Sequence, residues 1–141
     1  MAIILIFSAL LGLSIGSFLN VVIHRMPVGE SIIYPRSHCP SCNKTLSYRD
    51  LIPILSWLVS LGRCRYCRVQ INIRYLYVEI ITCVLFLSCV FSNPSDLYGY
   101  NPILIIIYGW ILVSIIIPLI FIDIDVLWLP SKITNSGIAI G

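Results

Sequence analysis

The sequence predicts an all-α integral membrane protein with three transmembrane helices, a truncated fourth and a cytoplasmic zinc-binding loop. Of its 141 residues, 59% are hydrophobic and 11% are charged, whereas a soluble domain carries about 25% charged residues. A chain this short cannot bury so much apolar surface in its own core. Eight of its nine Lys and Arg residues lie between Arg25 and Arg74, so one basic segment separates long uncharged ones. The small net charge of +3 and the apolar composition also exclude a nucleic-acid-binding domain.

Residues 1–23 are predicted to be the first transmembrane span. They contain no charged side chain, and about 20 apolar residues are enough to cross the hydrocarbon core as a helix. A cleaved signal peptide is the alternative interpretation. Its positive charges would precede the apolar region, but here they follow it, so the span is expected to stay uncleaved.

Two further spans are predicted over residues 75–91 and 102–122, joined by a turn-rich connection that contains Asn, Pro and Gly. A last apolar stretch covers residues 133–141. Nine residues extend only about 13 Å as a helix, which is under half a bilayer, so this stretch is expected to be part of a truncated fourth span. Residues 75–141 then form one transmembrane region that follows a polar loop over residues 24–74.

The positive-inside rule places the basic loop, residues 24–74, in the cytoplasm. The second span then leaves the cytoplasmic face and the third span returns to it. Asp123 and Asp125, at the end of the third span, are therefore predicted to lie on the same side of the membrane as the loop.

Four of the six cysteines form two C-x2-C pairs that are separated by twenty-one residues: Cys39, Cys42, Cys64 and Cys67. This spacing is close to that of four-thiolate zinc sites, in which each pair places two sulfurs on one side of a tetrahedral ion. Disulfides would need an oxidising compartment, which the cytoplasmic placement opposes. A redox C-x-x-C motif would accompany a βαβ pattern, which this sequence does not have. We therefore predict a structural zinc ion, whose binding would also stabilise a loop too small to build its own core.

Three other features of the polar loop and the second span allow different interpretations. His38 is an alternative zinc ligand. Cys83 and Cys89 are expected to be small packed residues of the second span. Residues 51–62 are apolar but too short to span, so they lie either on the membrane, which suits Trp57, or in a small core of the loop.

The acids at the membrane are candidates for function. Asp123 and Asp125 are either solvated residues at the membrane face or functional carboxyls. Side chains two positions apart on a helix point about 200° apart, so these two cannot form a dyad unless the helix unwinds. An aspartic protease needs two carboxyls that share a proton, and the partner would come from another segment. Glu79 is expected either to pair with Arg74 or to be functional.

Five segments appear in a recognisable order. They are Gly16-Ser-Phe-Leu-Asn-Val-Val-Ile-His-Arg-Met-Pro27, Pro35-Arg-Ser-His-Cys-Pro-Ser-Cys42, Leu61-Gly-Arg-Cys-Arg-Tyr-Cys67, Ile71-Asn-Ile-Arg-Tyr75 with Glu79, and Ile122-Asp-Ile-Asp-Val-Leu-Trp-Leu-Pro130. Together they resemble the type IV prepilin leader peptidases, which are bacterial inner-membrane aspartic proteases that also N-methylate the new amino terminus. The resemblance covers nearly the whole chain.

The resemblance implies that Asp123, seven residues before Pro130, is the first catalytic acid and that Asp125 is a less important neighbour. It also implies S-adenosylmethionine as methyl donor, type IV prepilins or pseudopilins as substrates, and cleavage at the cytoplasmic face of the inner membrane. Ser131 stands where the family commonly has aspartate. The family's second catalytic acid belongs to a Gly-x-Gly-Asp motif, which none of the eight glycines begins. The chain is therefore expected to be truncated and inactive as a protease on its own.

Two other functions compete with this interpretation. One is a non-catalytic zinc-knuckle membrane protein that binds a pilus or secretion partner through its cytoplasmic loop. The other is a small transporter subunit, which the spans support less because they have no polar midplane.

Overall fold

The computed structural model describes the backbone of residues 2–92 and 101–138, and the side chains of residues 2–92 and 101–125. This part of the chain is helical and contains no strand, only isolated bridges that pair His38 with Thr45 and Arg63 with Gln70. The elements in order are α1 (Ala2–Arg25), the 3-10 turns η1 (Met26–Val28) and η2 (Tyr48–Leu51), then α2 (Leu55–Val59), α3 (Arg74–Phe91) and α5 (Pro102–Ile138).

Three helical segments are long and apolar enough to cross a membrane: Ala2–Val28, Arg74–Phe91 and Pro102–Asp125. They confirm, by length and composition, the three predicted spans. Many of their large side chains are exposed, including Ile3 at 82% and Leu104 at 65%. Water would penalise such extended apolar surfaces, whereas lipid tails accommodate them, so the protein is an integral membrane protein.

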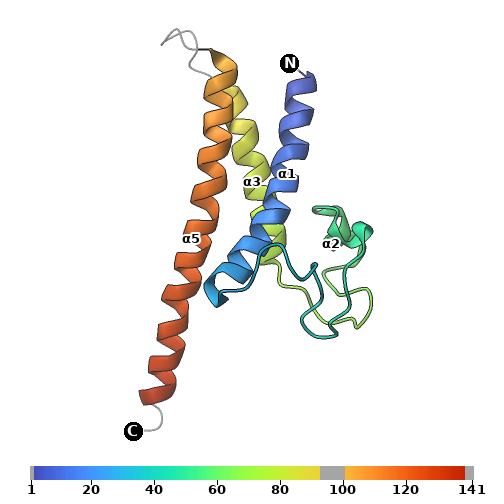
Figure 1. The fold of residues 1–141 in the computed structure, drawn as a ribbon, viewed down its shortest axis with the longest axis vertical. Helices are drawn as coiled ribbons and strands as arrows, with labels where there is room; N and C mark the ends of the chain where they lie inside the picture. The colour runs from blue at the N-terminus through green and yellow to red at the C-terminus, as the bar shows by residue number, and fades with distance from the viewer. Residues whose placement is uncertain (1, 93–100, 139–141) are drawn as a thin grey trace.

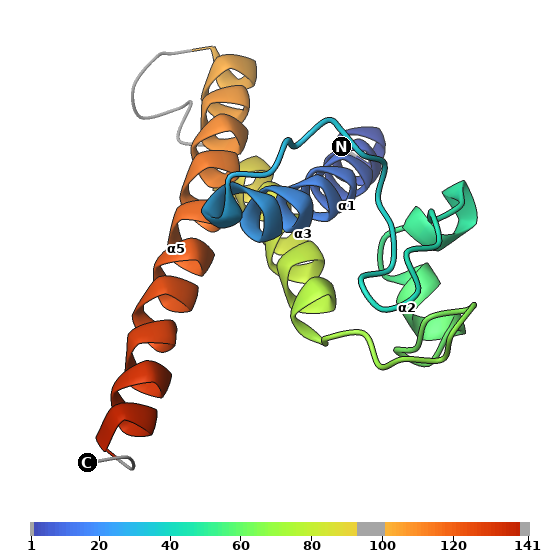
Figure 2. The same cartoon turned by 60° about the horizontal axis from the view of Figure 1, so that its bottom comes forward.

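The long helices pack against one another at an angle, with α1 crossing α3, and the polar loop projects from the side that faces away from α5 (Figures 1 and 2). The N-terminus and the start of α5 lie at one end of the molecule, the loop lies beside the lower part of α1, and the C-terminal part of α5 extends beyond it to the other end (Figure 1). Near the loop, the three helices share a buried cluster made of Leu19, Ile23, Val78 and Ile117. This packing fixes the positions from which the loop and the membrane-face acids extend.

Glycines allow α1 and α3 to approach each other closely. A Cβ atom at Gly16 would lie 2.8 Å from the Cα of Glu79, and one at Gly12 would lie 2.9 Å from the Cα of Cys83. Small residues spaced by four commonly form such helix contacts in membranes. One turn further on, the Asn20 side chain donates a hydrogen bond to the Tyr75 carbonyl at 3.0 Å and links the same two helices.

The course of α5 differs from the sequence prediction. A third span over residues 102–122 and a partial fourth over 133–141 were expected as separate segments, but one helix runs from Pro102 to Ile138. Proline removes a single hydrogen-bond donor, and in an apolar environment the helix still satisfies the remaining backbone groups best. A separate fourth helix is therefore not shown among the described residues, and residues 139–141 lie outside them.

The apolar segment between the cysteine pairs does not form a core of its own. It begins at the last residue of η2 and contains α2, and several of its large side chains face outward, with Leu55 at 58%, Leu58 at 50% and Val59 at 73% exposure. Trp57 is half-buried and lies against Gly62, whose backbone has a φ of +67°. Of the two predictions for residues 51–62, these exposures favour the membrane-lying one.

Candidate functional site

The same hairpin occurs twice in the polar loop, once around each C-x-x-C pair. In the first hairpin, the Cys39 N–H donates to the Lys44 carbonyl at 3.0 Å and the Asn43 N–H donates to the Cys39 carbonyl at 2.8 Å. The second hairpin repeats the first of these contacts between the Cys64 N–H and the Val69 carbonyl at 2.8 Å. Each hairpin thereby holds its two thiols at the tip of one tight turn.

The residue after each second cysteine reverses the chain. Asn43 has a φ of +53° and Arg68 a φ of +61°, both in the left-handed region. Asn occupies this region readily, but for a long side chain it is an uncommon conformation that costs on the order of 1 kcal/mol. Closing the second hairpin at Arg68 therefore needs support from the rest of the loop.

The two hairpins bring all four predicted cysteine ligands together. The sulfurs of Cys39, Cys42, Cys64 and Cys67 lie within 4.8 Å of one another, and those of Cys39 and Cys67 are 3.7 Å apart. A tetrahedral zinc with bonds of about 2.3 Å would separate its sulfurs by about 3.8 Å, so the donor set fits this ion. His38 is not among the residues of this cluster, and its Nδ1 lies 3.1 Å from the Arg36 carbonyl.

The hairpins give the thiols unequal acidity. Burial opposes ionisation of Cys39, but neighbouring backbone N–H groups and thiols outweigh it and lower its pKa to about 7. The Val69 N–H favours the Cys67 thiolate, yet burial and the other three sulfurs raise the pKa of Cys67 to about 12. A metal that binds all four thiolates must therefore displace protons, which makes its affinity depend on pH.

An acid not anticipated from the sequence ties η2 to the second hairpin. Asp50 accepts hydrogen bonds from the Ser47 N–H and the Tyr66 hydroxyl, each at 3.0 Å, and pairs with Arg65 at 3.4 Å. Burial opposes the charged form, but these three contacts together hold the pKa of Asp50 below its usual value. The capping pattern that begins at Ser47 is the sequence signal that would have revealed it.

At the membrane face, Arg74 is paired with an acid of another helix. Its Nη1 contacts both carboxylate oxygens of Asp125, at 2.5 and 2.6 Å. This corrects the predicted alternative in which Arg74 pairs with Glu79. Asp123 is exposed, whereas Asp125 is half-buried. Because α5 is helical through both residues, their side chains diverge and the structure does not bring them together.

Glu79 instead binds the backbone of the polar loop. Its side chain is in α3, its residue is 8% exposed, and its Oε2 accepts a 2.7 Å hydrogen bond from the Ile54 N–H. Ile54 has a φ of +61°, which is unfavourable for a β-branched residue. The carboxylate thus holds the start of α2 in a strained conformation against α3.

A sequence profile described as Bacterial Peptidase A24 N-terminal domain matches residues 10–93. The chain belongs to this family. The matched region includes α1 from residue 10 onward, both cysteine hairpins and α3, and therefore the cluster of four cysteines, Arg74 and Glu79.

Curated relatives extend the similarity along most of the chain. A prepilin leader peptidase/N-methyltransferase of Myxococcus xanthus is 44% identical over 136 residues, which cover 96% of this chain and 38% of the relative. A type 4 prepilin-like proteins leader peptide-processing enzyme of Escherichia coli is 39% identical, covering 89% of this chain and 51% of the relative. A prepilin leader peptidase/N-methyltransferase of Neisseria gonorrhoeae is 35% identical, covering 95% of this chain and 53% of the relative. The chain thus spans from about two fifths to about half of these relatives. No solved structure matches it.

Proposed function

We propose that this chain forms the N-terminal part of a membrane aspartic-type endopeptidase that removes the leader peptides of type IV pilin-like precursors and N-methylates the new amino terminus. The observation that carries this proposal is that the two acids on α5 differ in their contacts. Arg74 neutralises Asp125, while Asp123 stays exposed at the same membrane face. Asp123 is then the carboxyl that is free to act on a substrate.

Asp123 would act as one member of a carboxyl pair. One ionised carboxylate takes a proton from water as the water attacks the scissile carbonyl, and the other, protonated, donates to the leaving amine. Asp125 is a poor second member because its charge is held by Arg74. The relatives are about twice as long as this chain, so we propose that the second acid belongs to the part of them that this sequence does not cover.

The cytoplasmic face is the proposed location of this chemistry, in the bacterial inner membrane. Support comes from the excess of Lys and Arg in residues 24–74 and from the contact that places Asp125 at the loop end of α3. A membrane-embedded pilin precursor would present its leader junction at this level, where Asp123 is exposed.

The four cysteines are proposed to hold a structural zinc ion. Four thiolates fill a tetrahedral coordination sphere, so when bound the ion supplies stability to the loop and leaves no position for an activated water. S-adenosylmethionine is the proposed methyl donor, on the strength of the relatives' names and of the family resemblance. We assign no residue to its binding.

A chimera tests the assignment of the acids. Residues 1–141 would replace the matching part of the Myxococcus relative, and cleavage of a pilin precursor would be measured in membranes. We expect Asp123→Asn to abolish cleavage and Asp125→Asn to retain part of it, while the 141-residue chain alone shows none. Full cleavage by the Asp123→Asn chimera, or efficient turnover by the chain alone, would refute the proposal.

A second function is favoured by one specific observation. Within the described residues, Asp123 is not paired with a second carboxyl, and a non-catalytic protein would need no such pair. In that case the zinc loop would bind a pilus or secretion partner. The DNA after codon 141 separates the two: an in-frame Gly-x-Gly-Asp favours the enzyme, and a stop codon without such a remnant favours the binding protein.

A further inference from the structure

The depth of α2 can be worked out from contacts at the membrane face. The apolar span of α3 begins at Arg74 and that of α5 ends at Asp125, so the ion pair between these residues marks the boundary of both spans. Glu79 is five residues further along α3, which is about 7 to 8 Å deeper at 1.5 Å per residue. Because Glu79 binds the Ile54 N–H at 2.7 Å, the start of α2 lies at that depth.

The side chains of α2 suit an environment of lipid. Leu55, Leu58 and Val59 are at least half exposed, and Leu61 just after the helix is 83% exposed. Amphipathic segments that lie in a membrane interface are buried by about 5–10 Å, which agrees with the depth set by Glu79. The segment from Ile54 to Leu61 is therefore expected to lie within the leaflet.

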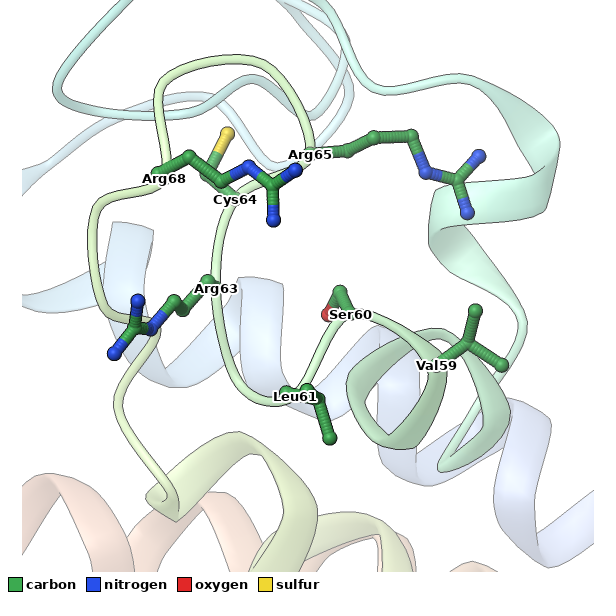
Figure 3. A pocket seen from close by; sticks show the side chains of 7 residues that line it. All are labelled: Val59, Ser60, Leu61, Arg63, Cys64, Arg65 and Arg68. Carbon is green, nitrogen blue, oxygen red and sulfur yellow. The ribbon is translucent and has the colours of Figure 1, made fainter.

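Three arginines, Arg63, Arg65 and Arg68, come shortly after Leu61 in the sequence. A pocket of about 200 Å³ is lined by Val59, Ser60, Leu61, Arg63, Cys64, Arg65 and Arg68. Figure 3 shows the three arginines spread around it, with Arg68 crossing beside Cys64 and with Arg63 and Arg65 extending in opposite directions. The pocket thus combines apolar side chains on the leaflet side with cations on the other.

The charges of the pocket are not satisfied within the described residues. Arg65 pairs with Asp50 at 3.4 Å, but Arg63 and Arg68 form no ion pair there. Guanidinium groups bind phosphate through paired, charge-assisted hydrogen bonds. The positive charge of these guanidinium groups favours an anionic occupant.

We propose that this pocket binds the phosphate headgroup of an anionic phospholipid in the leaflet that α2 enters. Arg63 and Arg68 contact the phosphate, and the acyl chains pass over Val59 and Leu61. Two arginines at a membrane surface account for about tenfold to thirtyfold in affinity. The lipid would hold the second cysteine hairpin against the membrane.

Native mass spectrometry of the purified full chain tests this site. The chain would be titrated in neutral detergent with phosphatidylglycerol, phosphatidylcholine or inorganic phosphate. We expect saturable binding of phosphatidylglycerol only, weakened about tenfold to thirtyfold by Arg63→Gln with Arg68→Gln. Arg36→Gln with Arg49→Gln removes the same charge elsewhere in the loop and should leave the binding unchanged.

Several results would overturn the proposal. Equal binding of phosphatidylcholine, an equal loss in both double variants, or equal binding of inorganic phosphate would each remove the lipid headgroup assignment. Loss of zinc from the Arg63→Gln and Arg68→Gln variant, with unchanged lipid binding, would mean that these arginines only balance the thiolates. The Leu61→Asn variant keeps every charge and should also weaken phosphatidylglycerol binding, whereas an unchanged affinity would contradict the insertion of this segment.

Discussion

Replacing Gly16 by Ala tests whether the contact between α1 and α3 sets the position of the polar loop. The new Cβ would lie 2.8 Å from the Cα of Glu79, whereas ordinary contacts are 3.4–4 Å. The two helix backbones would have to separate by about 0.6–1.2 Å, because the nearest atom belongs to the backbone and cannot rotate away. Overpacking of this kind costs about 1–3 kcal/mol, which lowers the ratio of folded to unfolded protein about 5- to 150-fold.

Gly109→Ala is the matched control for this substitution. Its Cβ would also meet an atom at 2.8 Å, but that atom is the Sγ of Cys89, at the end of a side chain that can rotate. Both variants gain the same intrinsic helix propensity, so their difference isolates the backbone clash. Unfolding in mixed micelles with increasing sodium dodecyl sulfate, followed by circular dichroism, measures this difference. Equal midpoints for the two variants would refute the reasoning.

The same clash should propagate to the loop through Glu79. If α3 moves at this residue, its 2.7 Å hydrogen bond with the Ile54 N–H lengthens. We expect amide hydrogen exchange at Ile54 to become faster in Gly16→Ala but not in Gly109→Ala. Unchanged exchange at Ile54 in a destabilised Gly16→Ala variant would show that the helix contact and loop docking are independent.

Three further predictions concern the loop and the membrane face. Arg68→Gly should relieve the left-handed strain and stabilise the zinc-loaded loop by about 1 kcal/mol, which would be measured as slower transfer of zinc to a chelator. Asn43→Gly is the control and should change the transfer rate little. Equal transfer rates for wild type and Arg68→Gly would contradict this prediction. Because the pKa of Asp50 is lowered in the folded loop, its stabilising contribution is complete above about pH 4 and is lost as the pH falls through the lowered value. The Ser47 amide proton shift should therefore titrate below about pH 4 in wild type and lose this step in Asp50→Asn; a midpoint at or above that pH would be inconsistent. A double-mutant cycle of Arg74→Gln and Asp125→Asn should give a coupling energy of about 1 kcal/mol. This coupling should weaken in high salt, since both side chains are about one third exposed. Zero coupling at low salt would rule out a stabilising ion pair.

The sequence alone was sufficient to predict the spans and the clustering of the four loop cysteines, because both depend on local patterns. A run of uncharged residues sets the length of a helix, and the C-x-x-C spacing of Cys39 and Cys64 with their partners sets the geometry of a turn. The contacts of Arg74 and Glu79 could not be obtained in this way. Arg74 binds Asp125, fifty-one residues away in sequence, and Glu79 binds a backbone N–H, which every residue except proline carries.

The course of α5 shows a second limit of local reasoning. The acids, the prolines and the change to polar residues after residue 122 predicted the end of a helix. In the structure the helix continues to Ile138, because each local signal weakens a helix without supplying an alternative set of backbone hydrogen bonds. The unequal environments of Asp123, which is exposed, and Asp125, which is paired with Arg74, follow from this continuity and from Arg74, neither of which the motif itself contains.

The link between α3 and the start of α2 runs through the peptide unit of Ile54 rather than through its side chain. Natural variants can therefore exchange isoleucine at this site for many other amino acids, glycine with relief of strain, and keep the tether. A proline would sever it, since its ring nitrogen carries no hydrogen. The tolerance of position 54 to replacement thus says little about how much the docking of the loop depends on it.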